Sequence, residues 1–279
     1  LLVLVSAGAG FMLRAPLGPE FPWAQGLLML AGVMLLSCGA SALNQVQERR
    51  RDALMARTAG RPLPSGRLSR VQGLAFALLA IAGGAGILWL GVGHTVGILG
   101  LVASAFYNGV YTPWLKPHSP FAAVPGAIPG SIPPVIGWVA GGGHLADAGA
   151  VMLFGILFLW QMPHFLAIAI LYRNDYAAGG FKMLPVIDKD LSVTSRQVLL
   201  YSLALVPVTL LPVALNMAGA AYFCTATLLG LAFFTFGINV AATKSRDDAR
   251  RLFIASIIYL PVLLTTLMLN KPPFFEMTN

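Results

Sequence analysis

Charged residues are scarce in this sequence. Asp, Glu, Lys and Arg make up 10% of its 279 residues, whereas 57% are apolar. A soluble globular domain carries about 25% charged residues, so this deficit excludes an ordinary soluble fold and indicates a membrane protein. No stretch is long and polar enough to form a separate soluble domain. We therefore expect residues 1–279 to form a single membrane domain.

Cysteine is also scarce. Cys38 and Cys224 are the only two, and both lie inside apolar segments. The sequence contains no CxxC pair and no Cys/His cluster, which argues against structural zinc and against a thiol redox pair. The net charge of +8 does not indicate a nucleic-acid partner, because a membrane protein carries excess Lys and Arg to orient itself in the lipid bilayer.

Apolar runs are abundant, and at roughly 20 residues per span they leave room for about nine crossings. The sequence predicts an all-α, polytopic bundle with helices at residues 1–14, 24–46, 70–91, 95–114, 120–140, 149–171, 197–216, 219–242 and 251–270. The second helix is expected to continue to about Arg51. The chain opens inside an apolar run without Met, so we expect the first helix to be truncated.

The distribution of basic residues supports this layout. If the loops after the second, fourth, sixth and eighth helices share one side, that side holds sixteen of the eighteen Lys and Arg residues. The opposite side holds only Arg14 and Lys271. The positive-inside rule then places the rich side in the cytoplasm, across a bacterial inner membrane or the equivalent membrane of an organelle.

A polar stripe lies at the cytoplasmic end of the second helix. Asn44, Glu48 and Asp52 are spaced four apart, so they share one helix face. Side-chain oxygens in this arrangement suit Mg²⁺, which shares its coordination shell with substrate phosphates. Arg57 and Arg61 follow closely and suit a metal-bridged diphosphate. The alternative is an ordinary charged flank of a membrane helix.

Residues 158–185 form a second polar centre. Gln161 and His164 lie three apart in an apolar span, and polar residues within membranes indicate function by default. A satisfied hydrogen bond between helices is the alternative for His164. Asp175 follows the helix end on the same side as Asp52, and Lys182 follows a Gly-Gly turn that could approach phosphate oxygens. Four prolines between residues 125 and 134 should bend the fifth helix, which we expect to line a cavity.

Together these motifs resemble the UbiA superfamily of intramembrane prenyltransferases, and within it the protohaem IX farnesyltransferase (haem O synthase) branch. The resemblance covers nearly the whole chain. It is carried by the segments Ala42–Gly66, Tyr111–Lys116, Ile132–Trp138, Trp160–Phe165, Asp175–Pro185 and Arg250–Pro261. Quinone and chlorophyll prenyltransferases of the superfamily typically have Asp at the position of Glu48 and a second acid four residues after Asp175. Here that second position is Gly179, as in the haem enzymes, which leaves open how a second metal would be held.

The resemblance implies a nine-helix fold of UbiA type and Mg²⁺-dependent transfer of a farnesyl group from farnesyl diphosphate to a vinyl group of protohaem IX. Haem would be the acceptor and not a cofactor. The implied metal ligands, which are also the catalytic residues, are Asn44, Glu48, Asp52 and Asp175. The implied diphosphate-binding residues are Arg57, Arg61, Lys116, Arg173 and Lys182. The haem and prenyl pocket would contain Tyr111, His118, Trp138, Trp160, Gln161 and His164.

Three other functions fit parts of the sequence. A prenyltransferase with an aromatic or quinone-precursor acceptor would need the same acidic motifs. A membrane transporter would suit a helix interrupted by prolines, but its polar groups are expected near mid-membrane rather than at one end. A haem-binding assembly factor for a terminal oxidase would not need Asn44, Glu48 and Asp52 in register. For the farnesyltransferase, a downstream haem-modifying enzyme or terminal-oxidase assembly is a possible partner.

Overall fold

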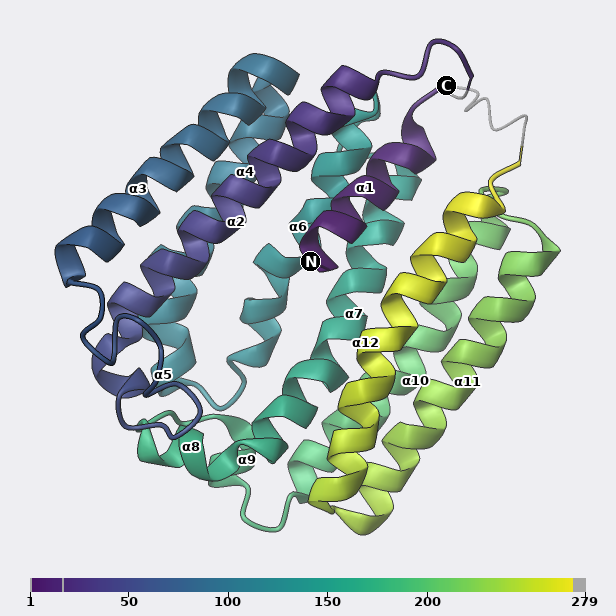
Figure 1. The fold of residues 1–279 in the computed structure, drawn as a ribbon. Coiled ribbons are helices and arrows are strands. Elements are labelled where there is room, and N and C mark those ends of the chain that lie inside the picture. The colour runs from purple at the N-terminus through teal and green to yellow at the C-terminus, as the bar shows by residue number, and fades with distance from the viewer. Residues whose placement is uncertain (1, 17, 273–279) are drawn as a thin grey trace.

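The computed structural model describes residues 2–16 and 18–272, which form a bundle of long helices joined by loops (Figure 1). The long helices are α1 (Leu2–Arg14), α2 (Trp23–Asp52), α3 (Arg70–Gly86), α4 (His94–Ala105), α6 (Ala123–Ala140), α7 (Ala148–Leu171), α10 (Ser192–Ala214), α11 (Ala220–Thr243) and α12 (Arg246–Leu269). Shorter helical segments are η1 (Ile87–Val92), η2 (Phe106–Leu115), α5 (Lys116–His118), α8 (Arg173–Ala178) and α9 (Leu184–Ile187).

Eight helical stretches in the described residues are long and apolar enough to cross a membrane, and α1 is a shorter apolar helix. The predicted all-helical, polytopic fold is therefore confirmed. The second helix extends as expected beyond its apolar part and ends at Asp52. The prediction did not separate η1 and η2, which continue α3 and α4 as π-helical turns.

The π-helix η2 has a local chemical cause. Pro113 lies inside it and has no backbone N–H, so one carbonyl about a turn earlier loses its helical partner. In a π-helix that carbonyl belongs to Asn108, five residues earlier. The Gln47 side chain of α2 donates a 2.8 Å hydrogen bond to this Asn108 oxygen. The bond compensates the proline and attaches η2 to the polar end of α2.

Close helix packing relies on glycine. The Cβ of any other residue at position 39 of α2 would lie 2.8 Å from the carbonyl oxygen of Ala77 in α3. A Cβ at position 84 of α3 would likewise lie 2.7 Å from the carbonyl oxygen of Gly32 and 2.5 Å from the backbone nitrogen of Leu36 in α2. Small residues allow helix backbones to approach in a membrane, where no hydrophobic force drives helices together.

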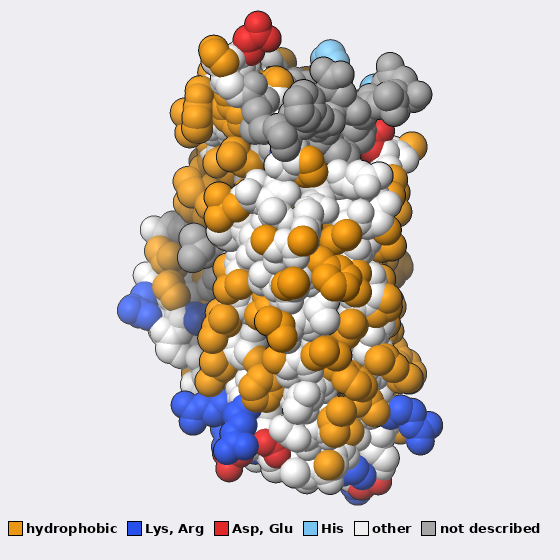
Figure 2. Space-filling view, turned by 90° about the vertical axis from the view of Figure 1, so that its right-hand side faces the viewer, with side chains coloured by type: hydrophobic (Ala, Val, Ile, Leu, Met, Phe, Trp, Pro, Cys, Tyr) orange, Lys and Arg blue, Asp and Glu red, His pale blue; other side chains and the backbone are white. Residues whose placement is uncertain are grey.

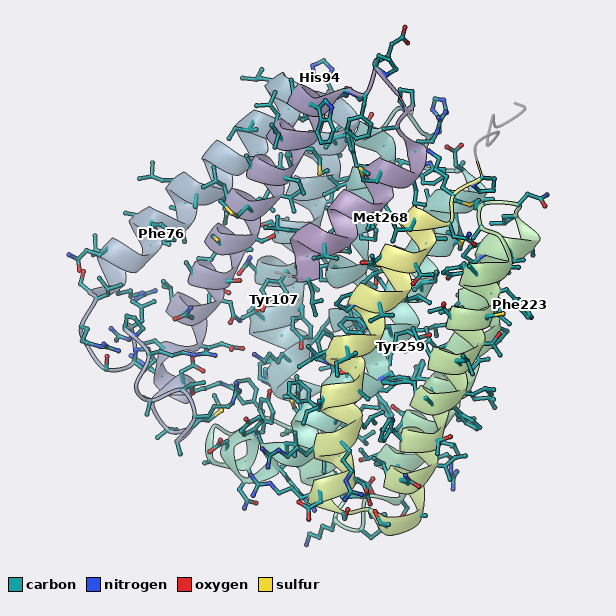
Figure 3. The ribbon with its side chains drawn as sticks, turned by 45° about the vertical axis from the view of Figure 1, so that its right-hand side comes forward. Phe76, His94, Tyr107, Phe223, Tyr259 and Met268 are labelled. Atoms are coloured by element: carbon teal, nitrogen blue, oxygen red, sulfur yellow. The ribbon has the colours of Figure 1, made fainter. Side chains whose placement is uncertain are left out.

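The two ends of the bundle differ in charge. Figure 2 shows Lys and Arg side chains gathered at its lower end, whereas an acidic side chain and His side chains lie at its upper end. We call the lower end the basic end; it contains the loop at residues 53–69, the segments α5, α8 and α9, and the turn at residues 244–245. Between the ends, Phe76 and Phe223 project outward from α3 and α11 (Figure 3), as expected for side chains that face lipid.

Candidate active site at the basic end

The polar stripe of α2 is buried within the bundle. Asn44, Glu48 and Asp52 are 8%, 5% and 1% exposed. Their spacing of four residues places them on one face over two turns of a helix without Gly or Pro at this end. Burial of two carboxylates is costly unless cations or hydrogen bonds compensate their charge, and each of them has a cationic partner.

The partners of Asn44 and Glu48 come from the η2–α5 segment. The Asn44 amide Nδ2 donates a 3.1 Å hydrogen bond to the Thr112 hydroxyl. One turn further along each segment, the Lys116 Nζ lies 2.7 Å from Glu48 Oε2. Within each segment the two residues are four apart in sequence: Asn44 and Glu48 in α2, and Thr112 and Lys116 in the η2–α5 segment. The two segments are therefore joined in matching register along the polar stripe.

The partner of Asp52 comes from the loop that follows α2. Arg61 Nη1 lies 3.0 Å from Asp52 Oδ2, and the Asp52 side chain is almost completely buried. The Thr58 hydroxyl donates a 2.8 Å hydrogen bond to the backbone oxygen of Asp52, which folds the loop back over the helix end. The loop at residues 53–69 thus delivers a guanidinium group to the last acid of the stripe.

Glu48 has one carboxylate oxygen, Oε1, that is buried and accepts no hydrogen bond from the described residues. A buried anionic oxygen without a partner is costly, so this atom is suited to bind a cation supplied from outside the protein. The Glu48 carboxylate and the amide oxygen of Asn44, one turn away, match the ligand preference of Mg²⁺. This ion keeps waters and substrate oxygens in the rest of its coordination shell. The described residues contain no group of three or more His, Cys, Asp and Glu side chains that could enclose a metal alone.

Asp175 lies at the basic end, as predicted, but its contact differs from those of Glu48 and Asp52. Its Oδ1 accepts a 3.2 Å hydrogen bond from the backbone N–H of Ala56, four residues after Asp52. The two acidic centres are therefore joined through the loop at residues 53–69 and not by a direct contact between their carboxylates.

Aromatic side chains hold the cations of this region in place. The Arg57 guanidinium stacks over the Tyr172 ring at 4.7 Å from its centroid, and Tyr176 lies 5.8 Å away. Burial raises the pKa of the Tyr176 phenol, although the positive charge of Arg57 opposes this shift. Phe181 is buried and receives Lys116 at 5.1 Å and Arg51 at 5.0 Å. Such cation–π contacts fix positive charge without neutralising it.

An apolar cavity of about 320 Å³ lies inside the bundle between α1, α2, α4, α6 and α7. Its volume falls in the range of small-molecule pockets. Pro129 and Pro133 line it, which confirms that the proline-rich helix faces a cavity. Ser37 and Ser41 also line it, seven and three residues before Asn44 on α2. Tyr107, which points into the interior in Figure 3, lines it from η2.

Gln161 and His164 both reach this cavity from α7, together with Trp160. Gln161 Nε2 donates to the Ser131 hydroxyl at 3.1 Å and to the Leu157 carbonyl oxygen at 3.0 Å. His164 Nδ1 lies 2.7 Å from the Ser256 hydroxyl, and the His164 ring stacks on Trp160. Gln161 and His164 therefore form hydrogen bonds to neighbouring helices and also line the cavity. The structural and the functional interpretation of these polar side chains are thus compatible.

Two predicted pocket residues, Trp138 and His118, do not line this cavity. Trp138 is fully buried at the opposite end of α6, where its indole Nε1 donates a 2.8 Å hydrogen bond to Asp147. The four-proline segment separates it from the basic end. His118 is exposed, and its Nδ1 lies 2.8 Å from the Trp114 carbonyl oxygen. Tyr111 stacks on the cavity residue Tyr107 but does not itself line the cavity.

Two predicted diphosphate-binding residues are also separate from the stripe. The Arg173 guanidinium donates hydrogen bonds to the carbonyl oxygens of Lys189 and Asp188 at 3.1 and 3.4 Å. Lys182 is exposed, and its backbone N–H donates to the Pro117 carbonyl oxygen. Neither side chain forms an ion pair with Glu48 or Asp52 in the described part of the chain.

Sequence reasoning did not assign Thr112 or Phe181 to the site. The available signal for Thr112 was its spacing of four residues before Lys116, which repeats the spacing of Asn44 and Glu48. Phe181 directly follows the Gly-Gly turn and gave no comparable signal. Its role depends on a contact with Lys116, which is distant in sequence.

Comparison with known proteins places these features in a family. A model of the UbiA prenyltransferase family matches residues 3–260. A protein of Solibacter usitatus (strain Ellin6076) named protoheme IX farnesyltransferase is 42% identical over 278 residues, covering 97% of this chain and 94% of the relative.

Two solved structures share the fold. The apo structure of a UbiA homolog from Aeropyrum pernix K1 has a TM-score of 0.72 at 21% identity and covers 96% of both chains. A UbiA homolog from Archaeoglobus fulgidus, bound to GPP and Mg²⁺, has a TM-score of 0.64 at 13% identity, with 96% of this chain and 95% of that chain covered. At these identities the likeness concerns the fold alone.

Proposed function

The chain belongs to the UbiA prenyltransferase family, and from this premise we propose that it transfers a farnesyl group from farnesyl diphosphate to a vinyl group of protohaem IX, forming haem O. The relative from Solibacter usitatus, which is similar over nearly the full length, is named for this activity. The observation that carries the proposal is the buried stripe of Asn44, Glu48 and Asp52 on the same helix as the cavity-lining residues Ser37 and Ser41.

The isoprenoid donor fits this arrangement in one orientation. The cavity is lined mainly by apolar side chains and accepts the farnesyl chain, whereas the polar stripe accepts the diphosphate. Ser41 lies one turn before Asn44, so the reacting carbon would lie between the cavity and the stripe. Lys116 and Arg61, which pair with Glu48 and Asp52, supply positive charge to the departing diphosphate.

Mg²⁺ is the metal that suits this donor set, and the solved Archaeoglobus fulgidus homolog was bound to Mg²⁺ and GPP. Glu48 Oε1, which accepts no hydrogen bond within the described residues, would hold the ion with Asn44 and Asp52, and Asp175 would complete the set from the other acidic centre. When bound, Mg²⁺ neutralises charge on the leaving diphosphate. Lys116 and Arg61 then exchange part of their contact with the acids for contact with phosphate oxygens.

The chemistry requires an environment from which water is largely excluded. The C–O bond to diphosphate breaks and a carbon–carbon bond forms to the vinyl group. Water then adds to the resulting cation and loses a proton. An allylic cation must be shielded until the carbon–carbon bond forms. Tyr107, Trp160 and Phe165 line the cavity and present aromatic faces that stabilise positive charge. His164 Nδ1 is engaged by Ser256, which leaves Nε2 as the ring nitrogen for contact with haem.

The chain is a multi-pass membrane protein, and we propose that its basic end faces the cytoplasm. The excess of Lys and Arg at this end supports that orientation. Farnesyl diphosphate would then reach the stripe from the cytoplasm, and the haem O product would pass to a haem-modifying enzyme or to terminal-oxidase assembly.

The test is direct conversion. Purified protein is incubated with farnesyl diphosphate, Mg²⁺ and either protohaem or an aromatic quinone precursor, and the products are identified by mass spectrometry. We expect protohaem to gain one farnesyl group and one hydroxyl group. Farnesylation of the aromatic acceptor with unmodified protohaem would refute the proposed acceptor, and absence of any transfer would refute the enzymatic function.

A further inference from the structure

A groove at the basic end, separate from the central cavity, collects four cationic residues. It has a volume of about 630 Å³ and lies where the loop after α2, the α7–α8 junction and the α11–α12 turn meet. Its lining includes Arg57, Arg173, Lys244 and Arg246. None of these residues lines the central cavity, and none pairs with Glu48 or Asp52 in the described part of the chain.

The charge of the groove is only partly compensated. Asp175 lies in its lining, and Lys244 Nζ is 3.9 Å from the exposed carboxylate of Asp190. Four cations and these two acids leave an excess of at least two positive charges, because Asp175 is also a proposed Mg²⁺ ligand. Within the described residues, Arg57 and Arg246 form no ion pair, and Arg57 is held instead by its stack on Tyr172. The groove therefore matches a ligand that carries two negative charges.

Apart from Asn174, the rest of the lining is apolar or aromatic. Ile170, Leu171 and Leu191 contribute side chains, and Tyr172 contributes an aromatic ring. A fully hydrated anion would gain nothing from these groups, whereas a flat apolar molecule with acidic substituents would contact both parts of the lining. Porphyrins such as protohaem have this chemistry, because two propionate groups share one edge of a large aromatic ring.

The position of the groove relative to the cavity suits the same molecule. His164 of α7 lines the cavity, and Leu171, seven residues later on the same face of this helix, lines the groove. Seven residues of helix correspond to about 10.5 Å along its axis. A porphyrin with its propionates in the groove would therefore extend toward the cavity with the opposite edge of its ring, where the vinyl groups are located.

We propose that this groove, through Arg173, Lys244 and Arg246, binds the two propionates of the acceptor porphyrin. The inference rests on the proposed function. It assigns the two anionic substrates to two basic sites: the diphosphate to Lys116 and Arg61, and the dicarboxylate to the groove. Arg173 is attached to the carbonyl oxygens of Asp188 and Lys189, so its charge is positioned before the ligand arrives.

The test compares the double variant Lys244→Gln/Arg246→Gln with the control Lys189→Gln/Arg196→Gln. The control removes one Lys and one Arg that are exposed at the same end but do not line the groove. In vesicles of zwitterionic lipid, the groove variant should raise the KM for protohaem about tenfold, as expected from two partly exposed ion pairs, and leave the KM for farnesyl diphosphate within about twofold. The control should match the unmodified protein.

Protohaem dimethyl ester, in which both propionates are masked, provides the second arm. The unmodified protein should bind it about tenfold more weakly than protohaem in an absorbance titration, and the groove variant should bind both equally. Equal binding of acid and ester by the unmodified protein would overturn the proposal. So would an effect of the groove variant only on activation by anionic-lipid vesicles, because the groove would then bind lipid headgroups. Failure of the unmodified protein to farnesylate protohaem despite binding it would instead refute the proposed function.

Discussion

The two acidic centres at the basic end are built differently. Glu48 and Asp52 are buried on a long helix and each forms an ion pair with a cation from another segment. Asp175 lies on the short helix α8, and its hydrogen bond goes to the backbone N–H of Ala56 in a loop. The first centre thus holds charge in a fixed position within the bundle. The second connects the loop at residues 53–69 to α8.

This difference predicts unequal sensitivity to mutation, and the largest effect belongs to the first centre. Glu48→Gln or Asp52→Asn should lower the rate of farnesyl transfer at saturating Mg²⁺ by about 1,000-fold or more, because the carboxylate charge that holds the metal is lost. The rate is measured with purified protein by product mass spectrometry, and folding is checked by gel filtration.

Glu20→Gln is the matched control, since Glu20 is an exposed acid at the opposite end of the bundle. It should retain full activity. If Glu48→Gln or Asp52→Asn remained as active as this control, neither carboxylate would be a metal ligand.

The next effect concerns the stability of the buried pair. Lys116→Met removes the cation beside Glu48 and leaves neither carboxylate oxygen of Glu48 with a partner in the described residues. Breaking a buried pair costs about 3–5 kcal/mol; with the Lys116 side chain 16% exposed, we expect about 2–3 kcal/mol, or a Tm lower by several degrees.

The double variant Lys116→Met/Glu48→Gln should recover part of that loss, because it no longer contains an unpaired buried charge. Calorimetry of both variants in the same detergent measures the difference. A double variant less stable than Lys116→Met alone would show that Glu48 is compensated by other groups.

A smaller effect is expected at the second centre. Asp175→Asn keeps an oxygen that can accept the hydrogen bond from Ala56 but loses the charge, so turnover should fall about tenfold and the Mg²⁺ concentration for half-maximal rate should rise. Asp175→Ala loses the hydrogen bond as well and should be slower than Asp175→Asn. If Asp175→Asn were as slow as Glu48→Gln, the two centres would be equivalent and the contrast between them would not hold.

Sequence patterns predicted the parts of this structure that depend on local chemistry. Apolar runs located the helices to within a few residues, and the spacing of Asn44, Glu48 and Asp52 placed them correctly on one face. The charge distribution correctly grouped the loops at the basic end. These features follow from periodicity and membrane thickness, which single segments encode without reference to their neighbours.

Features that depend on contacts between distant segments could not be predicted. The pair of Glu48 with Lys116 and the pair of Asn44 with Thr112 each join residues 68 positions apart. Pro113 suggests an irregularity, but its compensation by Gln47 is visible only once α2 and η2 are adjacent. Trp138 is a different case, because it lies at the opposite end of α6 and its hydrogen-bond partner Asp147 is only nine residues away.

The smallest effect is expected at that end of the bundle. Burial alone would raise the pKa of Asp147, but hydrogen bonds from the His144 N–H and the Trp138 indole lower it overall. An acid with a lowered pKa in the folded state stabilises the fold above its unfolded pKa of about 4 and loses this contribution as pH falls further. Asp147→Asn should therefore lower the Tm at pH 7 by about 1–2 °C. When the pH is lowered below about 4, the Tm of this variant should fall less than the Tm of the unmodified protein. Its kcat should not change, because Asp147 and Trp138 do not line the cavity; a large loss of kcat would return Trp138 to the active site.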